Sequence, residues 1–282
     1  MIERGYILLT HSPAMAPLTQ GMPTGLLPML DEPLTGLMLR LMKRHGVKRV
    51  TLIADDPSSA AMLGDGGVEG VTVDAVACWE ECDGEAAYIL PDNVLTDVDL
   101  CRIASAVENG SAEATAWQGI MAVSAQRAAK IPAGASAEQV ATLAAQDAVQ
   151  AEAQGYFCRV VDPDSYRQAQ ADLLAGKVGL PVQAHRYGRA IIARNGSVPG
   201  DVRVTGRCFV GRGVRVGAGS ILGQGTVLGS GAQIGGRCFL ENACIMPDTR
   251  VTGDACLRNV LVFPRYGAAD PAGMIRFSSA KS

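Results

Sequence analysis

Residues Val202–Glu241, VRVTGRCFVGRGVRVGAGSILGQGTVLGSGAQIGGRCFLE, decide the fold of the C-terminal third of this 282-residue chain. Counting in sixes gives an unbroken series of aliphatic residues: Val204, Val210, Val216, Leu222, Leu228, Ile234 and Leu240. A residue of equal or smaller size stands two positions before each, and 11 of the chain's 33 glycines fall between Gly206 and Gly236. A period of six fits neither an amphipathic helix nor an alternating strand. It is typical of a parallel β-helix of hexapeptides.

In such a β-helix three flat faces close one coil, and the aliphatic residue of each face points into the core. Each strand finds its hydrogen-bond partners in the coils above and below, and glycine suits the corners. The pattern places a break at Met246-Pro247, with the period resuming at Val251 and Leu257. Exposed coil ends and flat apolar faces favour self-association, so we expect a homo-oligomer formed through the β-helix.

Composition excludes several classes of protein. Hydrophobic residues make up 48% and charged residues 19%, which argues against disorder. A net charge of −3 indicates neither a nucleic-acid partner nor an anionic membrane surface, and no apolar run is long enough to span a bilayer. The start shows no signal peptide. The eight cysteines are irregularly spaced; Cys78 and Cys82 have no companions for a zinc site, so small buried thiols and a cytoplasmic location are expected.

The first two thirds alternate between strand and helix patterns. Short apolar runs at 7–9, 50–54, 86–90 and 119–123 predict strands, and helical patterns occur at 33–44, 99–109, 137–153 and 163–174. Alternation of this kind predicts a mostly parallel sheet covered on both faces. Ligands bind such sheets beyond the carboxyl ends of the strands, which here means residues 9–24 and Asp92.

The order of motifs resembles the sugar-nucleotide pyrophosphorylases. Leu9–Pro28, LTHSPAMAPLTQGMPTGLLP, is similar to their opening segment, and MLDEPL at 29–34 follows like their "PV-x-x-KPL". LPDN at 90–93 resembles "LGDN", and GYFCRVVDPDSY at 155–166 resembles "GYWLDIGTPEDY". The resemblance spans nearly the whole chain and is greatest to mannose-1-phosphate guanylyltransferases. It implies a Rossmann-like nucleotidyltransferase domain followed by a β-helix with a left hand.

The departures from the family pattern affect the chemistry. The resemblance puts Leu9, Thr10 and Ser12 where the family has phosphate-loop glycines, and Ala14 where it has an arginine. Pro13 removes an amide donor from the same loop. Thr24 stands for a lysine, and Arg159 for the second magnesium-binding aspartate, which leaves Asp92 as the one metal carboxylate. Phosphoryl transfer relies on such positioned charges, so we expect impaired catalysis.

The sequence allows two interpretations of the role of each of several residues. His11 could contact a phosphate or be a plain loop histidine, and Asp92 could hold Mg²⁺ or cap a turn. Arg159 could bind a phosphate or an acidic ligand in place of the metal, or form a surface ion pair. Acyl transfer, a frequent activity of β-helix enzymes, is disfavoured because no histidine follows His185.

We therefore predict three segments: a shortened nucleotidyltransferase-like domain at 1–178, a left-handed β-helix at 179–265 and a C-terminal tail at 266–282, of which FSSAKS at 277–282 is expected to fray. The favoured function is a catalytically impaired protein that binds a nucleotide sugar, or regulates or assembles with an active homologue in polysaccharide precursor synthesis. The alternatives are an active NDP-sugar pyrophosphorylase that uses Mg²⁺, and an oligomeric scaffold that binds no nucleotide.

Overall fold

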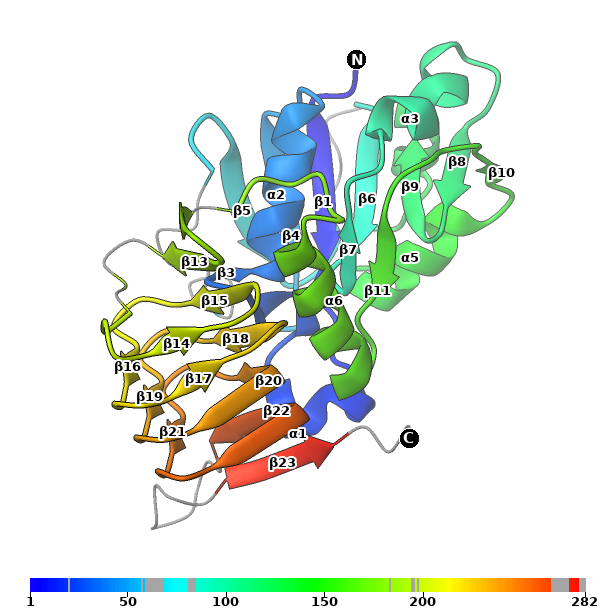
Figure 1. The fold of residues 1–282 in the computed structure, drawn as a ribbon. Helices are drawn as coiled ribbons and strands as arrows, with labels where there is room; N and C mark the ends of the chain where they lie inside the picture. The colour runs from blue at the N-terminus through cyan, green and yellow to red at the C-terminus, as the bar shows by residue number, and fades with distance from the viewer. Residues whose placement is uncertain are drawn as a thin grey trace. The chain divides into compact units, whose positions relative to one another are not determined.

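The chain folds into two compact units in a computed structural model (Figure 1). The structure describes residues 1–19, 21–56, 58, 68–80, 85–182, 184–193, 196, 198–264 and 274–278. The N-terminal unit comprises residues 1–27 and 32–161, and the C-terminal unit comprises 28–31 and 162–282. The division thus falls before the helix at 163–175, and the boundary predicted at 178 lies after it.

The N-terminal unit contains short helices around a sheet. Its strands are β1 (Arg4–Leu8), β3 (Glu32–Pro33), β4 (Arg49–Ile53), β5 (Thr72–Val76), β6 (Ala87–Pro91), β7 (Val94–Thr96), β8 (Ala114–Trp117), β9 (Ile120–Val123), β10 (Val149–Gln150) and β11 (Phe157–Arg159). Its helices are η1 (Pro13–Met15), α1 (Ala16–Thr19), η2 (Thr24–Leu26), α2 (Leu34–Arg44), α3 (Leu100–Glu108), α4 (Ala125–Ala129) and α5 (Ala137–Ala145).

The main sheet has the strand order β10-β8-β9-β6-β1-β4-β5. Strands β5, β4, β1 and β6 are parallel neighbours, while β9 runs antiparallel to both β6 and β8. The expected mixed α/β unit with a large parallel sheet is confirmed. The antiparallel β9 follows from the tight Gln118-Gly119 turn after β8, in which both residues have positive φ.

Helices cover both faces of this sheet. On one face an added Cβ at Gly5 would lie 2.8 Å from Met42 Sδ of α2, and Thr115 donates to the Ile103 carbonyl of α3. On the other face Tyr6 and Leu8 share a core cluster with residues of α5. Because successive strand residues point to opposite faces, the sheet is buried on both.

The helix predicted at 137–153 is shorter than expected. A capping box between Ser136 and Gln139 begins α5, which ends at Ala145. Asp147 then takes a left-handed φ of 53°, and Val149–Gln150 pair with β8 as an edge strand. Tertiary pairing therefore replaces the last two turns of the predicted helix.

The C-terminal unit is a stack of short strands. They are β2 (Pro28–Met29), β12 (Ala184–Tyr187), β13 (Ala190–Ala193), β14 (Arg203–Val204), β15 (Cys208–Val210), β16 (Arg215–Val216), β17 (Ile221–Leu222), β18 (Thr226–Leu228), β19 (Gln233–Ile234), β20 (Phe239–Ile245), β21 (Arg250–Val251), β22 (Cys256–Pro264) and β23 (Met274–Ser278). Its helix is α6 (Pro163–Ala175).

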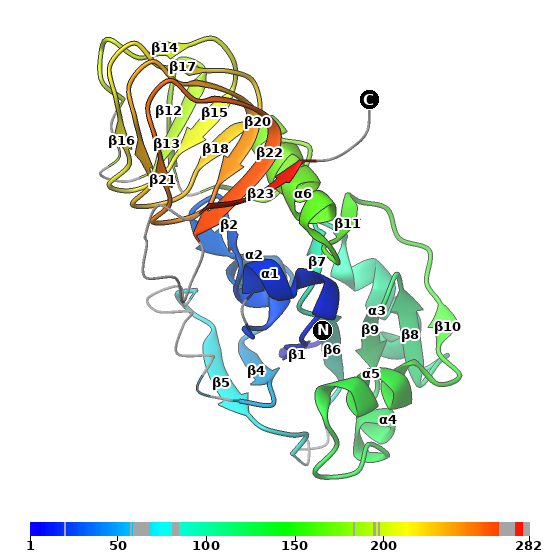
Figure 2. The same cartoon turned by 90° about the horizontal axis from the view of Figure 1, so that it is seen from below.

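Parallel pairing stacks these strands into three walls (Figure 2). Wall A contains β14, β17 and the starts of β20 and β22; wall B contains β13, β15, β18 and the second halves of β20 and β22; wall C contains β16, β19 and β21. Cys208 pairs with Thr226, a separation of 18 residues or three hexapeptides. This is the pairing expected of hexapeptide coils. The left hand of the β-helix stays a prediction.

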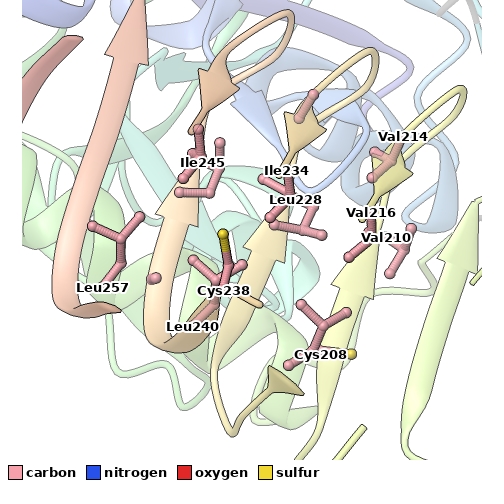
Figure 3. Packing of buried hydrophobic residues seen from close by; sticks show 14 of the residues in the cluster. Cys208, Val210, Val214, Val216, Leu228, Ile234, Cys238, Leu240, Ile245 and Leu257 are labelled. Atoms are coloured by element: carbon pink, nitrogen blue, oxygen red, sulfur yellow. The ribbon is translucent and has the colours of Figure 1, made fainter. Parts of the chain in front are cut away.

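The aliphatic series points into the space between the walls (Figure 3). Leu222, Leu228 and Leu240 are fully buried, and Cys208 and Cys238, the smaller residues two positions before Val210 and Leu240, lie in the same core. Large and small side chains therefore share each layer, as the sequence pattern predicted.

The period breaks earlier than we expected. Ile245 follows Leu240 in the inward series after five residues and pairs with Leu228, 17 residues away. The shortened corner contains Asn242 with a φ of 47°, where the preceding corners have glycine or Arg237. Asparagine tolerates this left-handed conformation better than most residues. The break thus lies at 241–244, and Met246-Pro247 belongs to a regular corner.

Helix α6 covers wall B of its own unit. The outward residues Phe209 and Val227 are buried there, while their counterparts on wall C are exposed. Tyr166 of α6 is also fully buried, and its hydroxyl lies 3.4 Å from Met246 Sδ. This packing explains why α6 belongs to the C-terminal unit.

The segment Pro28–Asp31 is fixed to the same unit by polar contacts. Gln170 of α6 accepts from the Leu30 amide at 2.7 Å and donates to the Pro28 carbonyl at 2.8 Å. Asp31 pairs with Arg212 and also accepts a hydrogen bond from Ser230. A buried glutamine whose donor and acceptor are both used holds this segment in one position.

Part of the C-terminal tail forms a strand. Met274–Ser278 form β23, which pairs antiparallel with β22, from Val260↔Ser278 to Pro264↔Met274. The free edge of β22 offers backbone groups that this strand satisfies. The rest of 266–282 lies outside the described residues.

The cysteines are free thiols wherever the structure describes them. Cys208, Cys238 and Cys244 are buried as expected, but Cys101 and Cys256 are exposed. Cys82 lies outside the described residues.

Truncating one inward residue of a coil should destabilise the C-terminal unit strongly. Leu222→Ala removes a fully buried side chain and should cost about 2–5 kcal/mol of unfolding free energy, measured by denaturant unfolding. Its neighbour Ile221, which points outward and is partly exposed, provides the control: Ile221→Ala should cost less than half as much. Equal losses would contradict the assignment of inward and outward positions.

Candidate functional site

The carboxyl ends of the sheet strands bring several predicted residues together. Thr10 follows β1, Asp92 follows β6, and the loop between β1 and α2 returns with Thr24-Gly25. The Thr24 amide donates to the Thr10 carbonyl at 3.2 Å. This edge is where ligands bind in open α/β sheets.

Asp92 is the centre of this cluster. It is fully buried, and it accepts the Thr10 hydroxyl on Oδ1 at 2.9 Å and the Gly25 amide on Oδ2 at 2.8 Å. The packing leaves no space at Gly25, since an added Cβ would lie 2.5 Å from Thr35 Oγ1 and 2.7 Å from Asp92 Cβ. The carboxylate therefore connects β1, β6 and the returning loop.

Burial also changes the acidity of this carboxyl. Desolvation raises the pKa of Asp92 from 3.8 to about 6, although the Gly25 amide and the Thr10 hydroxyl act in the opposite direction. Two neutral donors thus compensate only partly for the loss of water. The causes of this shift among the described residues are burial and neutral donors, and none of them is a cation.

The residues at this edge do not fit a magnesium ion. Mg²⁺ needs accessible oxygen ligands and keeps several waters, whereas both oxygens of Asp92 are buried and engaged by the chain. Across the described ranges no group of three or more His, Cys, Asp or Glu could hold a metal. The second carboxylate position of the family pattern is Arg159, which is a cation.

Two backbone amides of the loop that the resemblance aligns with the phosphate loop are already hydrogen-bonded. Leu9 is buried and its amide donates to the Ile53 carbonyl, while the Met15 amide donates to the Ser12 carbonyl and so closes η1. His11 and Ala14 are exposed on this loop. A phosphate cradle needs free amides that converge, and these two amides are committed to the fold.

Arg159 stabilises a turn. Its guanidinium donates to the Gln118 carbonyl at 2.7 Å, in the β8–β9 turn, and lies 5.9 Å from the centroid of the Phe157 ring. Arg159 is nevertheless exposed, so further N–H groups face solvent. The structure therefore gives it a carbonyl partner rather than the surface ion pair that we had considered.

Ser12 and Thr24 differ in their environments. Ser12 is half-buried, and its hydroxyl donates to the Val161 carbonyl at 3.4 Å. Thr24 is buried, and its hydroxyl has no hydrogen-bond partner among the residues that the structure describes. A buried, uncharged hydroxyl cannot supply the positive charge of the lysine that the family pattern has at this position.

Sequence reasoning missed two residues of the cluster. Thr35, in the first turn of α2, donates to the Gly25 carbonyl at 2.9 Å, and Gly25 supplies the amide for Asp92. Neither residue carries a local signal, because both matter only through tertiary contacts. Nearby, Asp99 caps α3, and Asp97 accepts the Tyr156 amide at 2.7 Å.

Two surface cavities lie away from this cluster. One of about 520 Å³ is lined by the loop at Pro132–Ala135 and by α5 residues including Glu138 and Thr142. Another of about 450 Å³ is lined by residues such as Glu3, Lys48 and Thr72. Neither cavity contains a residue predicted for the site.

No protein-family model matches this sequence, and no curated protein matches it either. Among solved structures, the chain is similar to a UDP-glucose pyrophosphorylase from Acinetobacter baumannii, with 14% identity and a TM-score of 0.45, over 62% of this chain and 94% of that one. A UTP-bound UGPase from Acinetobacter baumannii gives the same values. A similarity of this size supports no argument about function, which therefore rests on the geometry of this chain.

Within the described part of the chain, no helix has the length and apolar character needed to cross a membrane.

The raised pKa of Asp92 predicts a pH dependence of stability. The pKa of Asp92 is higher in the folded than in the unfolded chain, so protonated Asp92 contributes to the free energy of unfolding. This contribution is fully present below pH 3.8 and is lost as the pH rises through about 6. Asp92→Asn should remove this loss, so its stability relative to wild type should rise by up to about 3 kcal/mol between pH 4 and 7. Urea unfolding at several pH values measures it; a relative fall with rising pH would contradict the assignment.

The hydroxyls of Thr24 and Thr35 provide a matched pair of variants. Thr24→Val should leave stability unchanged or raise it by up to about 1 kcal/mol, because it removes a buried hydroxyl without a partner in the described structure. Thr35→Val deprives the Gly25 carbonyl of its donor and should cost about 1–3 kcal/mol. Thermal unfolding compares them, and a large loss in Thr24→Val would show that its hydroxyl has a partner.

Proposed function

We propose that this chain is a catalytically inactive relative of the sugar-nucleotidyltransferases that carry a left-handed β-helix. In this proposal it acts by assembling with another protein, such as an active homologue in polysaccharide precursor synthesis, rather than by turnover. The domain that resembles the enzymes serves as a folded platform, and the stacked coils provide the rigid surface of the assembly.

The environment of Asp92 is the observation that carries the proposal. The one acidic residue at the family's metal position is fully buried, and its two oxygens bind the Thr10 hydroxyl and the Gly25 amide. Binding a metal there would require breaking both hydrogen bonds and opening the loop. An enzyme preorganises its charged groups before the reaction, and such a reorganisation would oppose catalysis.

The other family positions support the same conclusion. Ala14 is an exposed alanine without charge, Thr24 is buried, and the Arg159 guanidinium is held by the Gln118 carbonyl. Each missing charge-stabilising group costs a rate factor on the order of 10² or more. Together these losses would make nucleotidyl transfer negligible.

Binding of a nucleotide or nucleotide sugar without turnover is the second candidate. The observation in its favour is the exposed Arg159 at the carboxyl edge of the sheet, close in the chain to Val161, whose carbonyl binds Ser12. An arginine with free N–H groups can bind a phosphate in bidentate fashion. This candidate differs from the first in requiring a ligand.

Turnover and binding can be measured separately. Pyrophosphate release with Mg²⁺, tested over several nucleoside triphosphates and sugar 1-phosphates, should be undetectable for the wild-type protein. A thermal-shift series with the corresponding nucleotide sugars should show no stabilisation, whereas a ligand at 100 times its Kd would add about 2.7 kcal/mol.

Two results would contradict the proposal. Pyrophosphate release that disappears in Asp92→Asn would establish an active enzyme. A thermal shift that Arg159→Ala removes, without loss of basal stability, would favour ligand binding at the carboxyl edge. Thr142→Ala, in the cavity beside α5, is the control for both measurements.

A further inference from the structure

The two compact units carry opposite net charges. The chain has 25 Lys and Arg and 28 Asp and Glu, of which the N-terminal unit holds 10 and 19, and the C-terminal unit holds 15 and 9. The net charges are therefore −9 and +6, which together give the −3 of the whole chain. The small net charge of the whole chain thus hides a large difference in charge between its two units. Surfaces of opposite charge attract each other and help to select binding partners.

The basic unit obtains its charge almost entirely from arginine. From Val178 to Ala280 the sequence has 12 arginines and no lysine. Arginine is enriched and lysine depleted at protein–protein interfaces. The reason is physical, because the planar guanidinium is weakly hydrated and pairs with a carboxylate through two parallel hydrogen bonds.

Wall C presents two of these arginines in one row. Arg215 pairs in register with Gln233, and Gln233 with Arg250, so the three side chains project outward from successive coils. All three are exposed. Strands stack at about 4.8 Å, which places the two arginines about 10 Å apart. Gln233 Oε1 accepts from Arg250 at 2.9 Å and orients it.

The backbone beneath this row is rigid. Val216, Ile234 and Val251, the inward neighbours on the same strands, are buried in the core of the coils. A rigid backbone lowers the entropy cost of presenting two cations to a partner. At the adjoining corners Arg212 pairs with Asp31 and Arg237 with Asp254, so these two cations are already neutralised. Asp248 adds one exposed carboxylate two residues before Arg250, which leaves the row with a net positive charge.

The N-terminal unit supplies complementary groups. Several of its cations form ion pairs within that unit, among them Lys48 with Glu3 and Lys130 with Glu113, each at 2.6 Å. Many of its carboxylates are exposed, including those of Asp74, Glu138, Asp147 and Glu152. The surface of this unit is consequently acidic. A partner that binds a row of arginines needs such carboxylates.

We propose that the arginine row of wall C, Arg215-Gln233-Arg250, binds the acidic N-terminal unit of a second copy of this chain. The contact is heterologous, since two different surfaces meet. This inference goes beyond the proposed function, because it concerns association of the chain with itself and not with another protein. A second copy is the occupant because the chain itself provides the complementary charge.

The test is the salt dependence of self-association. Sedimentation of the full chain at about 50 mM NaCl should show concentration-dependent association, weakened at least about tenfold at about 500 mM, where the screening length falls severalfold. Arg215→Glu/Arg250→Glu should weaken association at low salt at least about tenfold. Both positions are exposed, so the variant should unfold at the wild-type temperature.

A charge reversal on the other unit provides the control. Arg102 on α3 is exposed in the acidic unit, and Arg102→Glu should leave association equal or stronger. A monomer at low salt, or association that Arg215→Glu/Arg250→Glu leaves unchanged, would overturn the proposal. If the protein stays monomeric and binds a polyanionic resin through the same arginines, the partner of the row is a polyanion and not a second copy of this chain.

The inference and the proposed function fail separately. Pyrophosphate release by a protein that still self-associates through wall C would contradict the proposed function alone. An inactive protein that stays monomeric would contradict this inference alone.

Discussion

The spacing between coils constrains most of the C-terminal unit. Parallel strands stacked at about 4.8 Å bring the corners so close that an added Cβ at Gly206 would lie 2.3 Å from the Gln224 amide nitrogen, and one at Gly235 would lie 2.3 Å from that of Gly253. Glycine is therefore required at these corners. The same spacing keeps successive coils in register, which stacks the inward aliphatic residues in layers and aligns Arg215 with Arg250 on the outside. The spacing and register of the coils therefore determine both the packing of the core and the arrangement of charge on the surface.

In the N-terminal unit a single carboxylate has a comparable effect. Asp92 holds the ends of β1 and β6 to the loop that carries Gly25, and its buried position makes it a weaker acid than an exposed aspartate. A metal-binding carboxylate must be accessible and charged, whereas a structural one can be enclosed. The position that resembles a catalytic aspartate thus has the properties of a core residue, and this difference underlies our proposed function.

The sequence predicted the features that repeat and missed those that depend on distant contacts. The hexapeptide series identified the inward residues because burial recurs every six positions. It misplaced the break, since only the pairing of Ile245 with Leu228 reveals the five-residue step at Asn242. Asp92 and Thr10 were predicted to share the carboxyl edge, but their mutual hydrogen bond and the roles of Gly25 and Thr35 arise from tertiary packing. Strand β8 and the edge strand β10 were missed for the same reason.

The two ends of wall B determine how far the stack can extend. At the start β12 runs antiparallel to β13, and at the end β23 runs antiparallel to β22. A parallel stack ordinarily leaves unpaired backbone groups at each end, which a coil from another molecule could use to continue it. Here a strand of reversed direction occupies both places. A coil from another molecule therefore cannot continue the parallel stack directly on β13 or β22 of this wall.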